Sequence, residues 1–238
     1  MAAHGPPQTT TVHRIQRCPA KPVAGAAVPD AATAWQACLM VPAESSGKAG
    51  PRSAQRVRVV HLSAAAFRAL ADGDLAAANM VSPVPLTEYF VSPEWRGTWR
   101  RRSEQVAQDP ASAAWVTGVI WDEQAQTAVG RAGYHGPPDH SGMVEIGYAV
   151  DPACRRRGYA RAALEALLQR AAREPQVKVV RVTISPDNTA SNALASQYGF
   201  AKVGEQWDED DGLEIIYEVA ASRYRYQSGR IRAGGQDP

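Results

Sequence analysis

The chain has 238 residues, of which 45% are apolar and 21% are charged, and its formal net charge at pH 7 is +2. This composition is ordinary for a globular protein, and so small a charge excludes binding to nucleic acid through a uniformly basic surface. Three cysteines without metal-ligand spacing exclude a disulfide-rich scaffold and argue against a zinc site.

The sequence shows neither of two segments that would direct it to a membrane. No apolar run reaches the ~20 residues that a membrane-spanning helix needs. The opening "MAAHGPPQTTTVHRIQRCPAKP" lacks the apolar core of a secretory signal. We therefore expect a cytoplasmic protein without a membrane partner.

Patterning along the chain predicts one folded domain. Residues 1–55 are rich in small residues and proline, as in "CPAKPVAGAAVP". Such a segment buries too little apolar surface to offset the entropy lost on ordering, so we expect a disordered extension. Regular patterning begins at residue 56 and fades near the end. We predict a domain over residues 56–220 and a flexible tail over 221–238.

The first part of the domain is predicted to hold a strand and two helices. Alternating residues over 56–62 indicate a strand, and Ser63 and Gly73 would begin and end the next helix. A second helix is predicted over 92–109, with Ser92 as its N-cap. It carries four arginines that form a solvated helix face or, less favoured, a patch for nucleic acid: Arg96, Arg100, Arg101 and Arg102.

The centre of the domain is predicted to contain a hairpin and a crossover. Two apolar stretches, 113–122 and 127–136, flank the polar turn "DEQAQ" and indicate an antiparallel hairpin. The strand "MVEIGYAV" (143–150) follows, then a basic loop, an amphipathic helix from Gly158 and a β-rich stretch over 177–185. Such a crossover should lay its two strands parallel.

The last part of the domain is predicted to hold a short helix (188–198) and two strands (201–207 and 213–219) around an acidic turn. The acidic side chains there could concentrate a cationic amine, or could simply keep the turn hydrated; they are Glu205, Asp208, Glu209, Asp210, Asp211 and Glu214. The alternation of strands and helices along the chain predicts an α/β (α+β) fold.

The loop before the central helix holds Arg155, Arg156 and Arg157, followed by Gly158. The first N–H groups of a helix have no partner within it and carry partial positive charge, so they bind anions. The arginines add charge, and the glycine lets a ligand approach the backbone. A solvated loop is the plainer alternative, but as a binding site this loop indicates phosphate.

The pattern Arg155-x-x-Gly158-x-Ala160 resembles the pyrophosphate loop of the GNAT superfamily of N-acetyltransferases, Gln/Arg-x-x-Gly-x-Gly/Ala. Three other segments add to the resemblance: "EIGYAVDP" before the loop, "SPDN" after the next strand, and "YGFAKVGE" with the family's Gly-Phe pair. The similarity covers roughly residues 57–220 and looks like the branch that includes ribosomal-protein N-terminal acetyltransferases.

The resemblance implies a mixed central sheet of about six to seven strands, splayed between the fourth and fifth strands and flanked by about four helices. It implies acetyl-CoA as the acyl-donor cosubstrate, no metal, and transfer to a primary amine of a small molecule or a protein N-terminus. A non-catalytic acyl-CoA sensor is the alternative function. Because many members of the family dimerise, a homodimer stays open.

The resemblance also assigns residues to the cosubstrate. Backbone groups of Ala149 and Val150 would pair with the pantetheine arm, and Asn188 would contact the cofactor. Asn192 is a second candidate for that contact, or a helix-surface residue. The pyrophosphate would be wrapped by the loop and the first helical turn, including Arg155, Arg156, Arg157, Gly158, Tyr159, Ala160 and Arg161.

Glu145 is the candidate general base, because it interrupts an apolar strand beside the expected thioester. Its alternative role is a salt bridge at the strand surface. His135 and His140 flank the turn before this strand and lie either near the acceptor or at an ordinary surface.

The acid that would protonate the leaving thiolate is not evident. Many relatives carry a tyrosine four residues before the glycine of the Gly-Phe pair, but that position is Ala195 here. Ser191, Tyr148 or a water could supply the proton, or coenzyme A could leave unaided. Tyr198, next to Gly199, is expected to pack against its neighbours.

Overall fold

The structure is a computed structural model that describes residues 56–209 and 212–225. The described chain forms these strands and α-helices in order: β1 (Val57–Val60), α1 (Ala64–Asp72), α2 (Leu75–Val81), α3 (Arg96–Gln108), β2 (Gly118–Asp122), β3 (Thr127–Tyr134), β4 (Met143–Val150), α4 (Tyr159–Arg173), β5 (Val179–Ile184), α5 (Thr189–Gln197), β6 (Ala201–Asp208) and β7 (Gly212–Ala220).

The strands form one mixed sheet in the order β1-β2-β3-β4-β5-β7-β6. Neighbouring strands are antiparallel except for the central pair, β4 and β5, which is parallel. That pair flanks α4, so the predicted crossover and the predicted α/β fold with a mixed sheet are confirmed.

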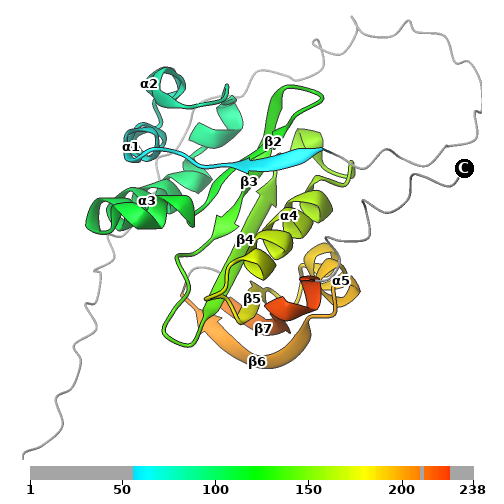
Figure 1. Ribbon diagram of the computed structural model, residues 1–238. Helices are drawn as coiled ribbons and strands as arrows, with labels where there is room; N and C mark the ends of the chain where they lie inside the picture. Colours follow the sequence, from blue (N-terminus) through cyan, green and yellow to red (C-terminus); the bar gives the residue numbers. More distant parts are fainter. Residues whose placement is uncertain (1–55, 210–211, 226–238) are drawn as a thin grey trace, which may run out of the picture. The chain divides into compact units, whose positions relative to one another are not determined.

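Buried side chains form two separate cores, and Figure 1 shows α3 and α4 on either side of β2, β3 and β4. In the first, Phe67 of α1 and Trp99 of α3 belong to the same buried cluster as Val119 of β2. In the second, Leu164 of α4 belongs to a cluster with Val144 of β4. The helices α1 to α3 thus contribute side chains to one core, and α4 contributes side chains to the other.

The helix α4 forms because its apolar residues recur at helical spacing and face the sheet. Ala163, Leu164, Leu167 and Leu168 are all buried, which confirms the predicted amphipathic helix. The hydroxyl of Tyr134 on β3 also donates a 2.7 Å hydrogen bond to the Leu167 carbonyl. This contact fixes α4 against the strands that lead to the basic loop.

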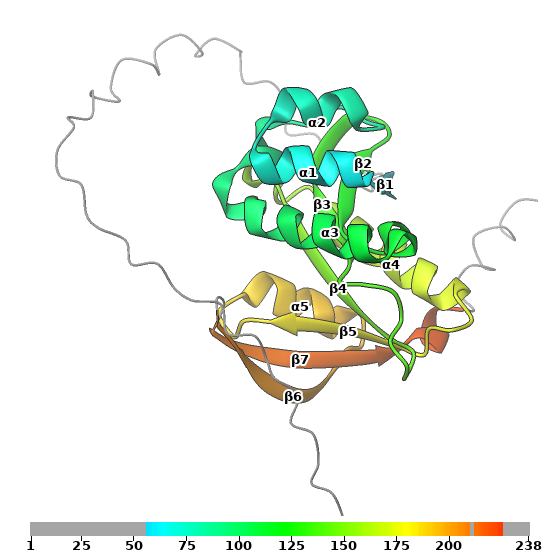
Figure 2. The same ribbon diagram turned by 90° about the vertical axis from the view of Figure 1, so that its left-hand side faces the viewer.

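The parallel pairing between β4 and β5 is short. Met143 to Glu145 pair with Val179 to Arg181, and no pairing of these strands is recorded beyond those residues. Further along, β4 pairs with β3 up to Val150, while β5 pairs with β7. Figure 2 shows β4 running away from the layer of β5, β7 and β6. The splay expected between the fourth and fifth strands is therefore present.

The predicted strand at 56–62 and the helix with Ser63 and Gly73 at its ends are confirmed. The second helix, predicted over 92–109, begins later, at Arg96. Pro93 to Trp95 form a 3-10 turn instead, and the Ser92 side chain makes no capping bond there. The helix α2 was not predicted.

The predicted surface patch on α3 needs a correction. Arg102 is only 5% exposed, and its side chain bonds to the Thr117 hydroxyl, just before β2, and to the His135 carbonyl, just after β3. Arg96, Arg100 and Arg101 are exposed. The four arginines therefore do not form one solvated face.

At the C-terminal end, ordered chain continues past the predicted boundary at residue 220. Ala221 to Tyr224 form a 3-10 helix, and both of those end residues are buried in the core that contains α4. The predicted extension over 1–55 and the remainder of the tail, 226–238, lie outside the described residues. Within the described chain, no helix is both long and apolar enough to cross a bilayer.

We expect Gly133→Ala to destabilise the protein by about 3 kcal/mol, because overpacking against immobile atoms is costly. A Cβ at Gly133 would lie 2.6 Å from the Thr117 Cα and 2.8 Å from the Thr117 amide nitrogen, both backbone atoms. Gly97→Ala is the control, since a Cβ there meets no atom within 4 Å and alanine favours the helix. Urea denaturation would measure both; equal stabilities of the two variants would contradict the prediction.

Candidate active site

The splayed strands border a cavity of about 400 Å³. Its wall is shared by β3, β4, β5, α5 and β7, and we call it the splay cavity. It is lined by Arg131, His135, Ile146, Gly147, Tyr148, Val182, Thr183, Ile184, Ser185, Asn188, Ser191 and Glu214. Separation of β4 from β5 beyond Glu145 is what opens it.

Glu145 lies where β4 and β5 cease to pair, opposite Arg181 in register. Its side chain is 19% exposed, and its Oε1 accepts a 2.8 Å hydrogen bond from the Thr183 hydroxyl on β5. The same oxygen lies 3.6 Å from Nδ1 of His135. The carboxylate is thus held at the mouth of the splay by partners from two strands.

His135 lies beside this carboxylate, and its backbone N–H donates a 2.8 Å bond to the Glu145 carbonyl. Its own carbonyl accepts bonds from Arg102 (3.0 Å) and Gln105 (2.8 Å) on α3. Desolvation of the ring lowers the pKa of His135 and the nearby Glu145 carboxylate raises it, while the positive charges of neighbouring arginines lower it further, so that the pKa lies below its usual value. Both histidines are exposed, but His135 lines the cavity, whereas His140, on the turn before β4, does not.

Tyr148 and Ser191 lie on the splay cavity from opposite sides, one on β4 and one on α5. Burial raises the pKa of Tyr148, and a hydrogen bond with the Ser191 side chain partly offsets that effect. Ala195 is buried in the core at 3% exposure. The two hydroxyl groups named from the sequence as substitutes for the missing tyrosine therefore do meet in the cavity.

The basic loop leads into α4 through two left-handed residues. Arg156 has φ 64° and Gly158 has φ 91°. Gly158 is the N-cap of α4 and offers no side-chain bond to its first amides. Arg155, Arg156 and Arg157 are exposed, as is Gly158. An uncapped, positively charged helix terminus at an accessible loop has the features of a phosphate site.

Tyr159 differs from the rest of the loop because its side chain points inward. It is 5% exposed, and its hydroxyl donates a 2.6 Å hydrogen bond to Oδ2 of Asp122. Asp122 ends β2 and also accepts bonds from the amides of Gln124 and Ala125. Only the backbone of Tyr159 is therefore placed to contact a ligand, while its side chain anchors the loop.

Ala149 and Val150 lie on the part of β4 beyond the pairing with β5, where β3 is the strand recorded beside them. The Val150 carbonyl accepts a 3.2 Å bond from Nε of Arg155. The loop is thus closed onto the end of β4. Ala160, in the first turn of α4, is half-buried and packs against the core.

The two asparagines of α5 have different roles. Asn188 is the N-cap of α5, accepts a bond from the Ser191 amide, and lines the splay cavity. The Asn192 side chain bonds to the carbonyls of Ser185 and Asn188, and accepts a bond from the Tyr217 hydroxyl. Asn192 therefore holds α5 against β7 and the preceding loop.

Arg161 and Tyr198 join α4 to the end of α5. Arg161 bonds to the Tyr198 hydroxyl (3.3 Å) and to Gln197 (2.5 Å), and Tyr198 also donates to Glu165. These contacts are consistent with the packing expected for Tyr198. Arg161, which was predicted to contact the pyrophosphate, thus bonds to residues at the end of α5.

The acidic hairpin contributes one member to the cavity. Glu214 lines the splay cavity and accepts a bond from Gln206, while Glu205 pairs with Lys202. Residues 210 and 211 lie outside the described chain. The hairpin therefore places a carboxylate on the β7 side of the cavity, across from the side formed by β3.

Two residues of the site were missed in the sequence, Arg131 and Thr183. Arg131 lies opposite Ala149 in register, and its guanidinium lies 3.9 Å from the centre of the Trp95 ring. In the sequence, the only signal for either residue was the alternation along its own strand, which places Arg131 on one face of β3 and Thr183 on one face of β5. Within residues 56–209 and 212–225, no group of three or more acidic, histidine or cysteine side chains could hold a metal ion.

Comparison with known proteins identifies the domain type. The family model described as the acetyltransferase (GNAT) domain matches residues 65–201. This match spans more than half of the chain and includes the splayed strands, the basic loop and α5.

Two curated relatives match shorter stretches. An uncharacterized N-acetyltransferase of Bacillus subtilis is 35% identical over 82 residues, which cover 34% of this chain and 49% of the relative. An L-2,4-diaminobutyric acid acetyltransferase of Streptomyces coelicolor is 31% identical over 110 residues, covering 43% of this chain and 62% of the relative. The chain thus spans about half to three fifths of the length of these relatives.

A solved structure shares the fold. A ribosomal L7/L12 alpha-N-protein acetyltransferase, in complex with coenzyme A, aligns with a TM-score of 0.51 at 17% identity. The alignment covers 72% of this chain and 97% of the other. At this identity, the likeness shows a common fold.

We expect Tyr159→Phe to lower the free energy of unfolding by about 1–3 kcal/mol at neutral pH, because a buried carboxylate loses a donor. Burial opposes the charge of Asp122, but the bonds from Tyr159 and two amides hold its pKa below the usual value. Stability from a lowered carboxyl pKa is present above the unfolded pKa and is lost as pH falls through the folded pKa. The deficit of the variant should therefore shrink in acid.

Tyr134→Phe is the matched control, because its hydroxyl donates to the neutral carbonyl of Leu167. The loss in free energy of unfolding caused by Tyr134→Phe should therefore stay the same when Asp122 is protonated in acid. Urea denaturation at neutral and acid pH would measure both variants. A deficit of Tyr159→Phe that stays constant across this range would remove the link to the Asp122 charge.

Proposed function

The chain belongs to the GNAT family of acetyltransferase domains, and from this we propose that it is an acetyl-CoA-dependent N-acetyltransferase acting on a primary amine. The observation that carries the proposal is the uncapped N-terminus of α4, with Gly158 at φ 91°, beside strands that part after Glu145. This arrangement would offer an anion site at the end of β4, an open strand edge along it, and a carboxylate where the strands part.

The chain's fit to acetyl-CoA rests on two features. The amides from Arg155 to Ala160 would hold the pyrophosphate, with the three loop arginines adding positive charge. The backbone of Ala149 and Val150 would pair with the pantetheine arm, and Asn188 lies on the cavity nearby. Binding at Val150 would require Arg155 to release the carbonyl that it now contacts. The cosubstrate supplies the acetyl thioester.

Glu145 would act as the general base. An acceptor amine enters as an ammonium ion and must lose a proton before its nitrogen can attack a carbonyl. The Glu145 carboxylate would take that proton, directly or through a water, while the Thr183 hydroxyl fixes its orientation. His135 lies 3.6 Å away, and its lowered pKa disfavours a competing positive charge there.

The leaving thiolate would receive its proton from Tyr148 or Ser191. Both line the splay cavity and share a hydrogen bond, so a proton given up by Tyr148 can be replaced through Ser191. Tyr148 and Ser191 would thus take the role of the tyrosine that many relatives carry at the position of Ala195. Removing either hydroxyl and measuring amine-dependent thiol release from acetyl-CoA would test this assignment.

The acceptor is proposed to be a small molecule or a protein N-terminus with a free primary amine. The curated diaminobutyric acid acetyltransferase supports a small-molecule amine. A non-catalytic acyl-CoA sensor would bind the cosubstrate without amine-dependent thiol release, so a turnover assay separates the two functions. Glu145 and its two partners favour the enzyme, because a sensor has no use for a base at the thioester.

We expect Glu145→Gln to lower kcat by about a hundredfold or more at neutral pH, because general bases contribute roughly that factor. The affinity for acetyl-CoA should change little. As pH rises the amine loses its proton to water, so the deficit should shrink. Thiol release would measure kcat; exposed Glu88→Gln is the control. Equal turnover of wild type and Glu145→Gln at every pH would remove Glu145 from the mechanism.

We expect Gly158→Val to weaken acetyl-CoA binding by at least about tenfold, since a branched residue is strained at φ 91° and would distort the loop whose amides we propose to hold the pyrophosphate. Calorimetric titration would measure the dissociation constant, and circular dichroism would check the fold. The control is Gly97→Ala, on the distant helix α3. An unchanged affinity in folded Gly158→Val would place the pyrophosphate elsewhere.

A further inference from the structure

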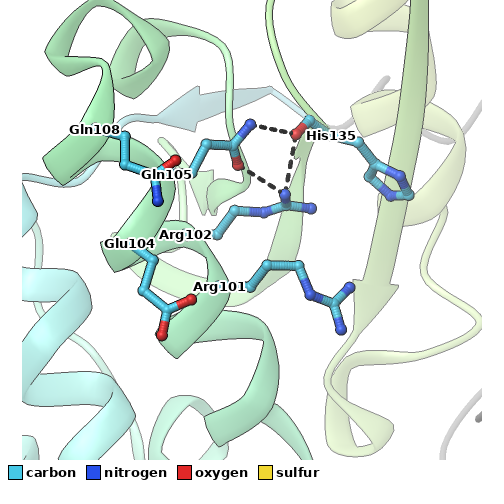
Figure 3. Close-up of a pocket in the computed structure, with 6 residues that line it drawn as sticks. All are labelled: Arg101, Arg102, Glu104, Gln105, Gln108 and His135. Carbon is cyan, nitrogen blue, oxygen red and sulfur yellow. Dashed lines mark hydrogen bonds between the residues drawn. The ribbon is translucent and has the colours of Figure 1, made fainter. Parts of the chain in front are cut away.

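A second cavity of about 400 Å³ lies between α3 and the end of β3, and we call it the α3 cavity. Five of its lining residues come from α3 and one follows β3, as Figure 3 shows: Arg101, Arg102, Glu104, Gln105, Gln108 and His135. None of these residues except His135 lines the splay cavity.

His135 connects the two cavities. It lines both of them, and its Nδ1 lies 3.6 Å from the Glu145 carboxylate. Its carbonyl is bound by Arg102 and Gln105 on the side of the α3 cavity. A small molecule whose amine reaches Glu145 would therefore have the rest of its structure next to α3.

The α3 cavity presents two guanidinium groups. In Figure 3, Arg101 and Arg102 extend in the same direction from α3, toward the side where His135 lies, whereas Glu104 points away from them. Burial, followed by the charges of Arg101 and Arg131, lowers the pKa of Arg102 to about 10, so it remains a cation at neutral pH. The Glu145 carboxylate acts in the opposite sense. Positive charge is thus concentrated close to the base.

Arg102 is rigidly placed. It is 5% exposed, its Nε donates to the Thr117 hydroxyl (3.2 Å), and its Nη1 donates to Gln105 (3.0 Å) as well as to His135. A buried cation held in this way loses little conformational freedom when it meets an anion. Arg101 is exposed and can close over the same group.

We propose that the α3 cavity binds the carboxylate of the acceptor, so that the acceptor is a small amine that also carries a carboxylate, such as an amino acid. The amine would lie at Glu145 and the carboxylate at Arg101 and Arg102. This inference rests on the proposed acetyl transfer, and it narrows the acceptor class.

The charges favour a carboxylate over other groups. A second ammonium group in the α3 cavity would be repelled by both guanidiniums, which excludes a simple diamine from this position. The Arg101 guanidinium can pair with a planar carboxylate through parallel N–H bonds. Arg102, whose Nε and Nη1 are already bonded, would add a bond from Nη2. A doubly charged phosphate at this position would face stronger repulsion from the Glu145 carboxylate, whose charge acts on Arg102, than a singly charged carboxylate would. A single negative charge is the best match.

The test compares amino acids with their decarboxylated counterparts as acceptors. Ornithine is paired with putrescine and lysine with cadaverine, and thiol release from acetyl-CoA gives kcat and KM. Wild type should use the amino acids with the higher kcat/KM. Arg101→Gln should raise KM for the amino acids by at least about tenfold, the cost of losing a charged hydrogen bond, and leave the diamines unaffected or improved.

Arg100→Gln is the control, because Arg100 is exposed on the same helix and does not line the cavity. It should match wild type. Turnover of diamines at least equal to that of amino acids, or identical behaviour of the Arg101 and Arg100 variants, would overturn the carboxylate site while leaving acetyl transfer to amines intact.

Binding separates the inference from the proposed function if no acceptor is acetylated. Calorimetric titration of the coenzyme A complex with ornithine and putrescine needs no turnover. Ornithine binding that Arg101→Gln weakens would support the carboxylate site and count against the enzyme. Binding of neither compound, or equal binding of both, would overturn the site.

Discussion

The short pairing of β4 with β5 is the constraint on which the rest of the structure depends. Three residues of each strand pair, and beyond them β4 keeps β3 while β5 keeps β7. A parallel sheet closed along its full length would bury these backbone groups between strands. By parting after Glu145, the two strands expose a polar strand edge within an otherwise packed sheet, and the splay cavity follows directly.

A splay of this kind needs external support, because each strand loses a neighbour. On one side, the hydroxyl of Tyr134 holds α4 through the Leu167 carbonyl, and Tyr159 holds the start of α4 to Asp122. On the other, Asn192 and Tyr217 hold α5 to β7. Polar bonds thus fix the helices on both sides of the opening, where an apolar contact alone would not fix direction.

Much of the fold could be predicted because its signals are local. Helical spacing gave α4 and its buried face, alternation gave β4, and Ser63 and Gly73 marked the ends of α1. The short α2 was missed because a seven-residue helix offers too few positions for a clear period. Glu145 and the loop could be proposed because both stand out against an apolar strand and a regular helix.

The remaining features depend on contacts between distant parts of the chain. In the sequence, His135 and His140 are equally good candidates for a place near the acceptor. Only the pairing of β3 with β4 shows that His135 lies beside Glu145. Arg102 looked like a surface residue, and only its bonds to Thr117 and His135 show it to be internal. Likewise, the meeting of Tyr148 with Ser191 requires α5 to fold back over the splay. Such pairings carry no periodic signal in sequence.

The two separate cores have a consequence for how such a domain can diversify. The loop and α4 are packed through one core, whereas α1 to α3 are packed through the other, and the two share little beyond the sheet. Substitutions in α3 can therefore reshape the surface next to Glu145 without disturbing α4, whose first amides we propose to hold the pyrophosphate. Under the proposed function, a lineage could exchange one acceptor for another through α3 and inherit the acetyl-CoA site unchanged.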